Sequence, residues 1–128
     1  MTNQIIKTTK APAPIGPYSQ AVKAGNFLFI SGQVAIEPST GDMKNATIQD
    51  EASQVMKNLS VILYEAGYEF SDVVKTTIYL SDMSLFATVN EIYSGSFGNS
   101  SCFPARETVA VNGLPKNANV EISMIACK

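Results

Sequence analysis

Apolar residues recur along this chain with two different periods, and the longer period marks two helices. From residue 47 to residue 66 an apolar side chain returns every three or four positions, the spacing that places side chains on one face of an α-helix. Thr47 suits the N-cap of this helix, and Gly67 suits the left-handed position just beyond its end. The same spacing over residues 85–97 predicts a second, shorter helix.

The shorter period, in which apolar and polar residues alternate, marks strands. In the segment 120–127 the even-numbered residues are all apolar, while Glu121 begins the set that points to the other face of a sheet. Three prolines and a glycine make residues 10–19 an extended loop, and Gly25-Asn26 suits the turn of a hairpin. The expected strands cover residues 4–8, 21–24, 27–33, 73–80, 106–111 and 119–127.

The order of these elements, β-β-β-α-β-α-β-β, predicts one α+β domain over residues 1–128, with both helices packed on one face of a mixed β-sheet. The other sheet face is then uncovered, although Ile125 and Cys127 place apolar side chains on it. Because such a face must be hidden from water and no third helix is available, we expect another copy of the chain to cover it. The sequence therefore predicts a closed homo-oligomer.

The charge and composition of the chain exclude several kinds of partner and catalytic site. Nine lysines and arginines against eleven aspartates and glutamates give a net charge of -2, whereas nucleic-acid-binding surfaces are densely basic, so nucleic acid is not expected as a main partner. The chain has no histidine, which removes the Ser-His-Asp triad, the Cys-His dyad and metal sites built on imidazole. We expect neither a metal nor a cofactor, and any reaction must use carboxylate, guanidinium, hydroxyl, thiol or backbone groups.

The cysteines and the lengths of the apolar runs indicate the cellular compartment of the protein. Cys102 and Cys127 lie far apart and no secretory leader precedes them, which predicts a cytoplasmic protein with reduced thiols. The longest apolar runs, such as residues 27–30, are far shorter than the roughly 20 residues that cross a bilayer. No membrane association is therefore expected.

Two charged residues near the predicted last strands are the main candidates for chemistry. Arg106 follows Phe103-Pro104-Ala105, where proline restricts the chain, and its planar guanidinium suits a bidentate grip on a carboxylate. Glu121 lies in an apolar strand on the uncovered face, where desolvation would raise its pKa toward the range of a general acid or base. The alternatives are a surface ion pair of Arg106 with Glu107 or another acid, and an interface salt bridge for Glu121.

Further residues could contact a small ligand. Gly32, beside Ser31, would let a ligand approach backbone N–H groups, although a plain strand end also explains it. Tyr18 in the proline loop could stack on a ligand or hydrogen-bond to it, and Asn90 on the second helix could equally face water. Taken alone, these residues predict no more than a small oligomer with an arginine and glutamate site for a small carboxylate.

Several short segments, in order and over nearly the whole chain, resemble the RidA family, which is also called the YjgF family. They are residues 13–22 (APIGPYSQAV), 31–33 (SGQ), 74–77 (VKTT), 86–90 (FATVN), 103–106 (FPAR), 114–116 (LPK) and 120–122 (VEI). The resemblance implies a chorismate-mutase-like fold and a homotrimer with three ligand pockets at the subunit clefts. It also implies hydrolysis of reactive enamines and imines, of the 2-aminoacrylate and 2-aminocrotonate type, to 2-keto acids and ammonia.

The resemblance assigns roles to individual residues. Arg106 would clamp the substrate carboxylate, and Glu121 would orient or activate the attacking water. The positions that match the lining of the family's pocket are Tyr18, Ser31, Gly32 and Asn90, together with the backbone of Thr108. Such a site needs no metal, because imines hydrolyse readily in water and positioning alone supplies much of the acceleration.

The chain departs from the family pattern at Glu107-Thr108, where many members carry Ser-Cys. A role for that cysteine thiol is therefore absent here, while a backbone contact survives. Two other functions stay open: a non-catalytic regulatory protein that binds 2-keto acids or other small carboxylates, and a ribonuclease or translation inhibitor, names attached to some family members. The acidic charge balance and the absence of histidine argue against cleavage of RNA.

Overall fold

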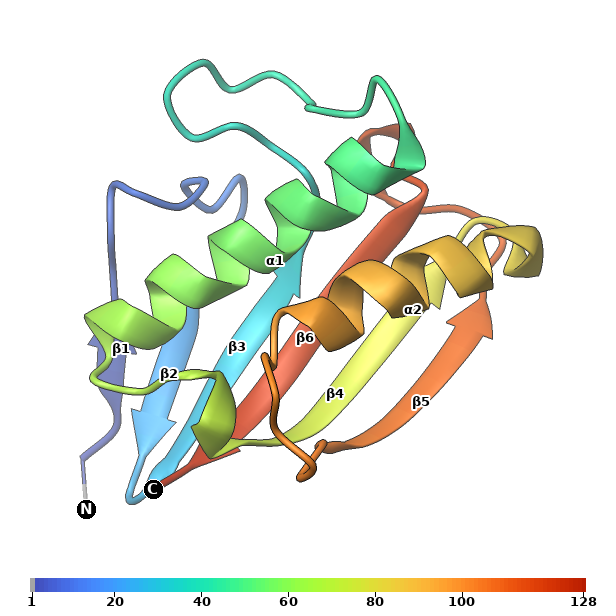
Figure 1. Ribbon diagram of the computed structural model, residues 1–128. Coiled ribbons are helices and arrows are strands. Elements are labelled where there is room, and N and C mark those ends of the chain that lie inside the picture. Colours follow the sequence, from blue (N-terminus) through green and yellow to red (C-terminus); the bar gives the residue numbers. More distant parts are fainter. Residues whose placement is uncertain (1) are drawn as a thin grey trace.

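A computed structural model describes residues 2–128, which form a six-stranded mixed sheet with two α-helices across one face (Figure 1). The strands are β1 (Gln4–Ile6), β2 (Ala21–Ala24), β3 (Phe27–Gln33), β4 (Val73–Leu80), β5 (Ala105–Ala110) and β6 (Val120–Cys127). The helices are α1 (Ile48–Glu65) and α2 (Phe86–Gly95), and the 3-10 turns are η1 (Phe70–Asp72), η2 (Met83–Leu85) and η3 (Pro115–Asn117). The predicted α+β class and element order are confirmed.

The ends of the helices follow local capping chemistry. Thr47 Oγ1 accepts a hydrogen bond from the backbone N–H of Asp50 at 3.0 Å, and Gly67 takes a left-handed conformation with φ +83° after α1. The second helix is shorter than the predicted range 85–97. Asp82 caps the separate turn η2 in front of it, and the chain leaves the helix after Gly95.

The order of strands across the sheet is β1-β2-β3-β6-β4-β5, so β6 is central and β5 forms an edge. All neighbouring strands are antiparallel except β4 and β5, which α2 connects as a crossover. The pairing of β3 with β6 shifts register between Ile30 and Gln33. This bulge lies opposite the part of β6 that begins the candidate site.

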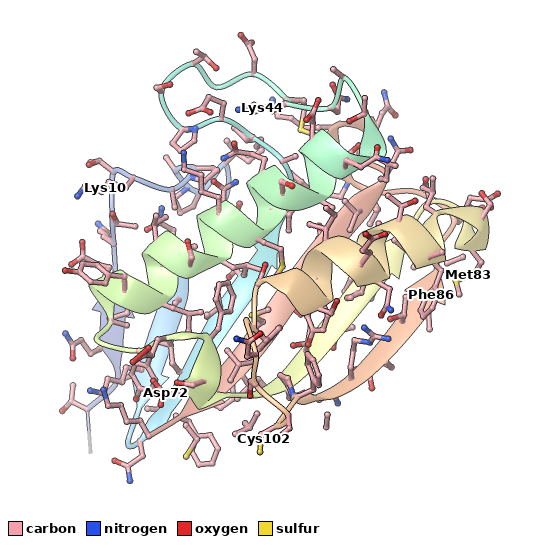
Figure 2. All side chains as sticks on the ribbon, in the orientation of Figure 1. Lys10, Lys44, Asp72, Met83, Phe86 and Cys102 are labelled. Atoms are coloured by element: carbon pink, nitrogen blue, oxygen red, sulfur yellow. The ribbon has the colours of Figure 1, made fainter. Side chains whose placement is uncertain are left out.

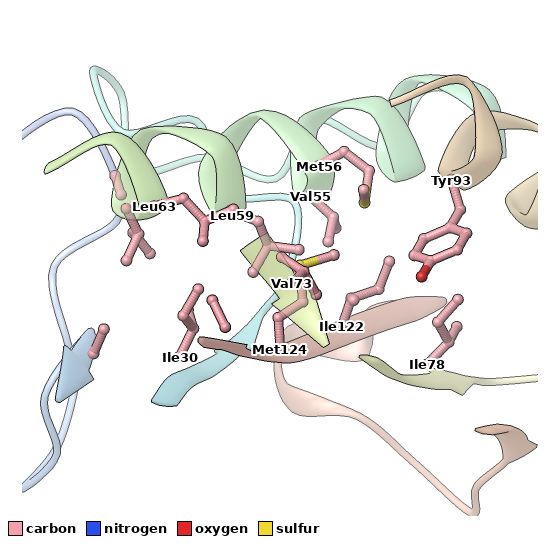
Figure 3. Packing of buried hydrophobic residues seen from close by; sticks show 14 of the residues in the cluster. Ile30, Val55, Met56, Leu59, Leu63, Val73, Ile78, Tyr93, Ile122 and Met124 are labelled. Carbon is pink, nitrogen blue, oxygen red and sulfur yellow. The ribbon is translucent and has the colours of Figure 1, made fainter. Parts of the chain in front are cut away.

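The core fills the space between the helices and one face of the sheet (Figure 3). Leu59 and Leu63 of α1 are almost completely buried, and so are Ile122 and Met124 on the facing side of β6. Burial of each such side chain contributes about 1.5–3 kcal/mol relative to leaving it exposed. All even-numbered residues of β6 are buried under the helices, as the alternating pattern predicts.

A buried carboxylate fixes the start of β6 to α1. Glu51, in the first turn of α1, is completely buried. Its two oxygens accept hydrogen bonds from the backbone N–H of Asn119 at 2.7 Å and from the side-chain amide of Asn119 at 3.0 Å. Hydrogen bonds to a charged group are worth about 1.5–3 kcal/mol. They therefore hold the position two residues before Glu121 firmly.

The other face of the sheet carries no helix and is partly apolar. Phe27, Phe29 and Val109 lie on this face and keep 43–46% of their surfaces exposed in the single chain. The predicted apolar character of the uncovered face is thus confirmed. Among the described residues, no helix combines the length and apolar character that a membrane crossing requires.

A charge on the uncovered face should break an assembly that covers it. We expect the wild-type chain to run as an oligomer at micromolar concentration, and Phe29→Lys to shift the mass toward that of one 13.7 kDa chain, because an unpaired buried charge costs several kcal/mol. Light scattering after size-exclusion chromatography measures both masses. The matched control is Tyr64→Lys, which changes an aromatic residue that is 84% exposed on α1 and should leave the mass unchanged. A wild-type mass of one chain contradicts the prediction.

Candidate functional site

The predicted site residues gather around two hollows of one chain. The first, of about 360 Å³, contains Tyr18, Ser31, Gly32 and Glu121 in its lining. The second, of about 430 Å³, is lined by Asn90, Tyr93, Ser94, Phe103, Pro104 and Arg106. Each hollow therefore holds one of the two charged candidates.

The carboxylate of Glu121 lies directly against the backbone of β3. A methyl group at Gly32 would stand 2.7 Å from Glu121 Oε2 and 2.8 Å from its carboxyl carbon, so only glycine leaves room for the side chain in this position. Burial raises the pKa of the Glu121 carboxyl above its ordinary value. A carboxylate with a raised pKa is a stronger base than one that is fully exposed to water.

The proline loop that forms one wall of this hollow is anchored by Gln20, which is 97% buried, with 3% of its surface exposed. Its side-chain amide donates to the backbone oxygens of Thr8 at 3.0 Å and Pro12 at 2.9 Å, and its oxygen accepts from the N–H of Thr8 at 2.8 Å. Ser31 Oγ donates to the backbone oxygen of Ser19 at 2.6 Å. These bonds place Tyr18, which is half exposed, at the rim.

The opposite wall is the segment before β6. Lys116 and Asn117 both have positive φ, 58° and 53°, a conformation that non-glycine residues adopt rarely. The backbone is held there by the bonds of Asn119 to Glu51 and by the N–H of Ser81, which donates to the Asn119 backbone oxygen at 2.9 Å. As a result Lys116 lines the same hollow as Glu121.

Arg106 lies in the second hollow and is held by α2. Its Nη1 donates to Asn90 Oδ1 at 2.7 Å. Its guanidinium carbon is 5.1 Å from the ring centre of Tyr93 and 5.6 Å from that of Phe86. Phe86, which is labelled in Figure 2, begins α2. Asn90 therefore faces Arg106. The remaining guanidinium N–H groups are available to a ligand in the hollow.

Thr108 lies on the same side of β5 as Arg106. The N–H of Val111 donates to the backbone oxygen of Leu80, so the alternating amides of β5 that include Arg106 and Thr108 point away from β4, at the free edge of the sheet. Thr108 Oγ1 is buried and has no hydrogen-bond partner among residues 2–128. The backbone N–H of Thr108 therefore points outward from the free edge of the sheet, two residues along β5 from Arg106.

The two charged residues lie on opposite faces of the sheet. Arg106 pairs in register with the buried Thr76 beneath α2, whereas Glu121 lies between Val120 and Ile122, which both point to the helices. β4 separates β5 from β6. Within one chain, the structure does not bring Arg106 and Glu121 together.

Glu107 is not the partner of Arg106. It lies on the uncovered face, where Lys75 Nζ is 3.2 Å from Glu107 Oε1 and Thr77 Oγ1 donates to Glu107 Oε2 at 2.7 Å. These two groups, Thr77 first, hold the pKa of the Glu107 carboxyl below its ordinary value. The alternative of an Arg106–Glu107 ion pair is therefore wrong.

Several residues of the site were not singled out in the sequence. Tyr93 falls within the predicted second helix, where its spacing from Phe86 and Asn90, seven and three residues, places all three on one helix face. The position of Gln20, a polar residue between the proline loop and a predicted strand, is the one feature of the sequence that could have indicated its anchoring role. Nothing in the sequence indicated the conformation of Lys116. Among residues 2–128, no group of three or more Cys, Asp or Glu residues could hold a metal ion.

Comparisons with known proteins cover nearly the whole chain. The family model described as Endoribonuclease L-PSP matches residues 8–128. A RutC family protein of Pyrococcus horikoshii is 52% identical over 98% of each chain. A mouse protein named 2-iminobutanoate/2-iminopropanoate deaminase is 50% identical over 96% of this chain and 90% of its own. The crystal structure of Escherichia coli TdcF with bound serine superposes with a TM-score of 0.93, at 39% identity and 98% coverage of both chains.

The contact between Gly32 and Glu121 can be tested by adding one methyl group. We expect Gly32→Ala to push the carboxylate outward into water and to lower the Glu121 pKa toward its ordinary value, measured by carbon-13 NMR titration of the carboxyl group. Gly95→Ala is the matched control, since a methyl group there meets nothing within 4 Å. An unchanged Glu121 pKa in Gly32→Ala would contradict the close packing.

Proposed function

The chain belongs to the endoribonuclease L-PSP family, which is the RidA or YjgF family, and on this premise we propose that it hydrolyses 2-imino acids, formed from reactive enamines such as 2-aminoacrylate, to 2-keto acids and ammonia. The observation that carries the proposal is the half-buried Arg106, held by Asn90 and two aromatic rings with further N–H donors facing a hollow. The mouse relative is named for this activity. We further expect it to act in the cytoplasm.

We propose that each complete site joins two subunits of a homotrimer. Arg106 and Glu121 lie in different hollows and on opposite faces of one chain, and the uncovered face that carries Glu121 is partly apolar. If a neighbouring copy covers that face with the edge of its sheet, Arg106 of one subunit can approach Glu121 of the next. The Arg106 half then supplies Asn90 and Thr108, and the Glu121 half supplies Tyr18, Ser31 and Gly32.

The Arg106 half binds the substrate carboxylate. A guanidinium can donate two parallel hydrogen bonds to one carboxylate, and such charge-assisted pairs are roughly twice as strong as neutral ones. The outward N–H of Thr108 adds a third donor and needs no particular side chain. The family's Ser-Cys pair can therefore be replaced by Glu107-Thr108 without loss of this contact.

The Glu121 half activates water. Water adds to the carbon of the protonated imine while the Glu121 carboxylate accepts one of its protons, which gives a neutral carbinolamine. Glu121 then returns this proton to the amino nitrogen, and the C–N bond breaks as the carbinolamine hydroxyl gives its own proton to the Glu121 carboxylate, which releases ammonia and leaves the 2-keto acid. Ammonia takes the proton from Glu121 and leaves as ammonium, so the carboxylate is restored. The raised pKa of Glu121 makes its carboxylate a stronger base for the proton that it accepts from water. Proximity of carboxylate, water and imine supplies the acceleration.

The other functions are outcomes of the same test. The family description names an endoribonuclease, but the net charge of -2 and the absence of histidine give no support for RNA as substrate. A protein that only senses 2-keto acids would use the same carboxylate contacts and bind without turnover. TdcF, with bound serine, is a structural neighbour that binds a small amino acid.

Removal of the guanidinium should abolish most of the activity. In an assay that generates 2-aminoacrylate with a dehydratase, we expect Arg106→Ala to lower kcat/KM for keto-acid release by about 100-fold, the loss of two hydrogen bonds to a charged group. Lys57→Ala, which removes an exposed cation from α1, is the control and should stay within about twofold of wild type. A wild-type chain that does not accelerate keto-acid release, or a fully active Arg106→Ala, refutes the deaminase proposal.

The division of the site between subunits predicts complementation. Arg106→Ala and Glu121→Ala should each be inactive alone, yet trimers refolded from an equal mixture should recover about one quarter of the wild-type activity, because each site draws an intact residue from each neighbour with probability one half. Each variant refolded alone is the control. If the mixture stays as inactive as its components, both residues of a site come from one subunit.

A further inference from the structure

The ring beneath Arg106 is itself tied to the sheet. Tyr93 comes from α2 and is almost completely buried, with 3% of its surface exposed. Figure 3 shows its ring reaching down from the helix toward the sheet. Its hydroxyl donates a hydrogen bond to Thr76 Oγ1 at 3.0 Å. Burial raises the pKa of this hydroxyl, so the group remains protonated and able to donate.

Thr76 connects this ring to the strand beside Arg106. It lies in β4, is completely buried, and is the register partner of Arg106 across the parallel β4–β5 pair. Two contacts of Thr76 therefore act on Arg106. The pairing of β4 with β5 fixes the backbone of Arg106, and the hydrogen bond from Tyr93 to Thr76 fixes the ring that the guanidinium faces. Thr76 does not line the hollow, and Tyr93 does.

The Tyr93 ring restricts a rotation of the Arg106 guanidinium that the hydrogen bond to Asn90 alone would allow. Asn90 accepts from Nη1 alone, so the guanidinium can still turn about this contact. The Tyr93 ring, 5.1 Å from the guanidinium carbon, adds an attractive surface that restricts its position. A side chain that is already immobilised pays less conformational entropy when it binds an anion.

We propose that Tyr93 and Thr76 are positioning residues, which hold the Arg106 guanidinium in place for the substrate carboxylate. The inference rests on the proposed function for its effect on turnover, but the ordering of Arg106 is a property of the ligand-free protein. Their removal should weaken carboxylate binding and leave the hydrolytic step, which belongs to the Glu121 half, nearly unchanged.

The ordering is measured by NMR on the ligand-free protein. The side-chain Nε–Hε signal of Arg106, assigned by its loss in Arg106→Lys, should show a high heteronuclear NOE in wild type and in Thr76→Ser, which keeps the hydroxyl. It should show a lower NOE in Tyr93→Phe and Thr76→Val, which each remove one side of the hydrogen bond. Tyr68→Phe is the matched control, because it deletes the hydroxyl of another buried tyrosine, which donates to the backbone oxygen of Asn26 at 2.8 Å and not to a residue beside Arg106.

The same variants are titrated with 2-oxobutanoate by calorimetry and assayed for turnover. We expect Tyr93→Phe and Thr76→Val to raise the Kd by about threefold to tenfold, the cost of immobilising one flexible side chain, with KM rising in parallel and kcat within about twofold of wild type. Tyr68→Phe should match wild type in all three quantities.

Each outcome decides one of the two proposals. An unchanged Arg106 signal and Kd in Tyr93→Phe and Thr76→Val overturn the positioning role, and so does an equal loss in Tyr68→Phe, which would reflect general destabilisation. A wild-type protein that neither binds 2-oxobutanoate nor releases keto acid overturns the proposed function. In that case the NOE of ligand-free Arg106 alone decides whether Tyr93 and Thr76 hold it.

Discussion

Strict alternation of side chains across a single sheet is the constraint on which the site depends. It places Arg106 beneath α2 and Glu121 on the face without helices, with β4 between their strands. No side-chain rotation within one chain removes this separation. In the proposed reaction the two groups must act on one small molecule, so assembly and chemistry become the same requirement. In the proposed homotrimer, burial of the apolar side chains on the uncovered face favours assembly, and the edge strand β5 provides the arginine.

A chain without histidine needs a carboxylate whose pKa lies closer to neutrality, and the fold provides one by packing. The bulge in β3 brings Gly32 against Glu121, where no Cβ intervenes, and the surrounding strands bury the side chain in part. Desolvation is the cause of its raised pKa. The buried Glu51 has a structural role, because its oxygens accept hydrogen bonds from two N–H groups of Asn119 and so tie α1 to the start of β6.

Periodicity predicted most of the fold because burial here follows local geometry. The bounds of β2, β3 and β4 match the expected strands, and the face on which Glu121 lies follows directly from alternation along β6. The same rule, applied to β5, would have excluded an ion pair between the adjacent residues Arg106 and Glu107, which point to opposite faces. Tyr93 was not predicted as a site residue because an aromatic residue at helical spacing is indistinguishable from core until its neighbour across the sheet is known. The left-handed backbone at Lys116 depends on contacts with Glu51 and Ser81, which are distant in sequence.

The exposed edge of β5 leaves backbone N–H and C=O groups without partners, and the proposed site uses one of these N–H groups. An edge strand presents unpaired N–H and C=O groups that invite pairing with another chain. Here charged side chains flank that edge on both faces, Arg106 beneath α2 and the Lys75–Glu107 pair on the other side, and they oppose such pairing. In the proposed site the outward N–H of Thr108 binds a small anion instead of a neighbouring strand. In the proposed site a carboxylate accepts hydrogen bonds from this N–H and from Arg106 together, so the arginine that opposes strand pairing also binds the ligand.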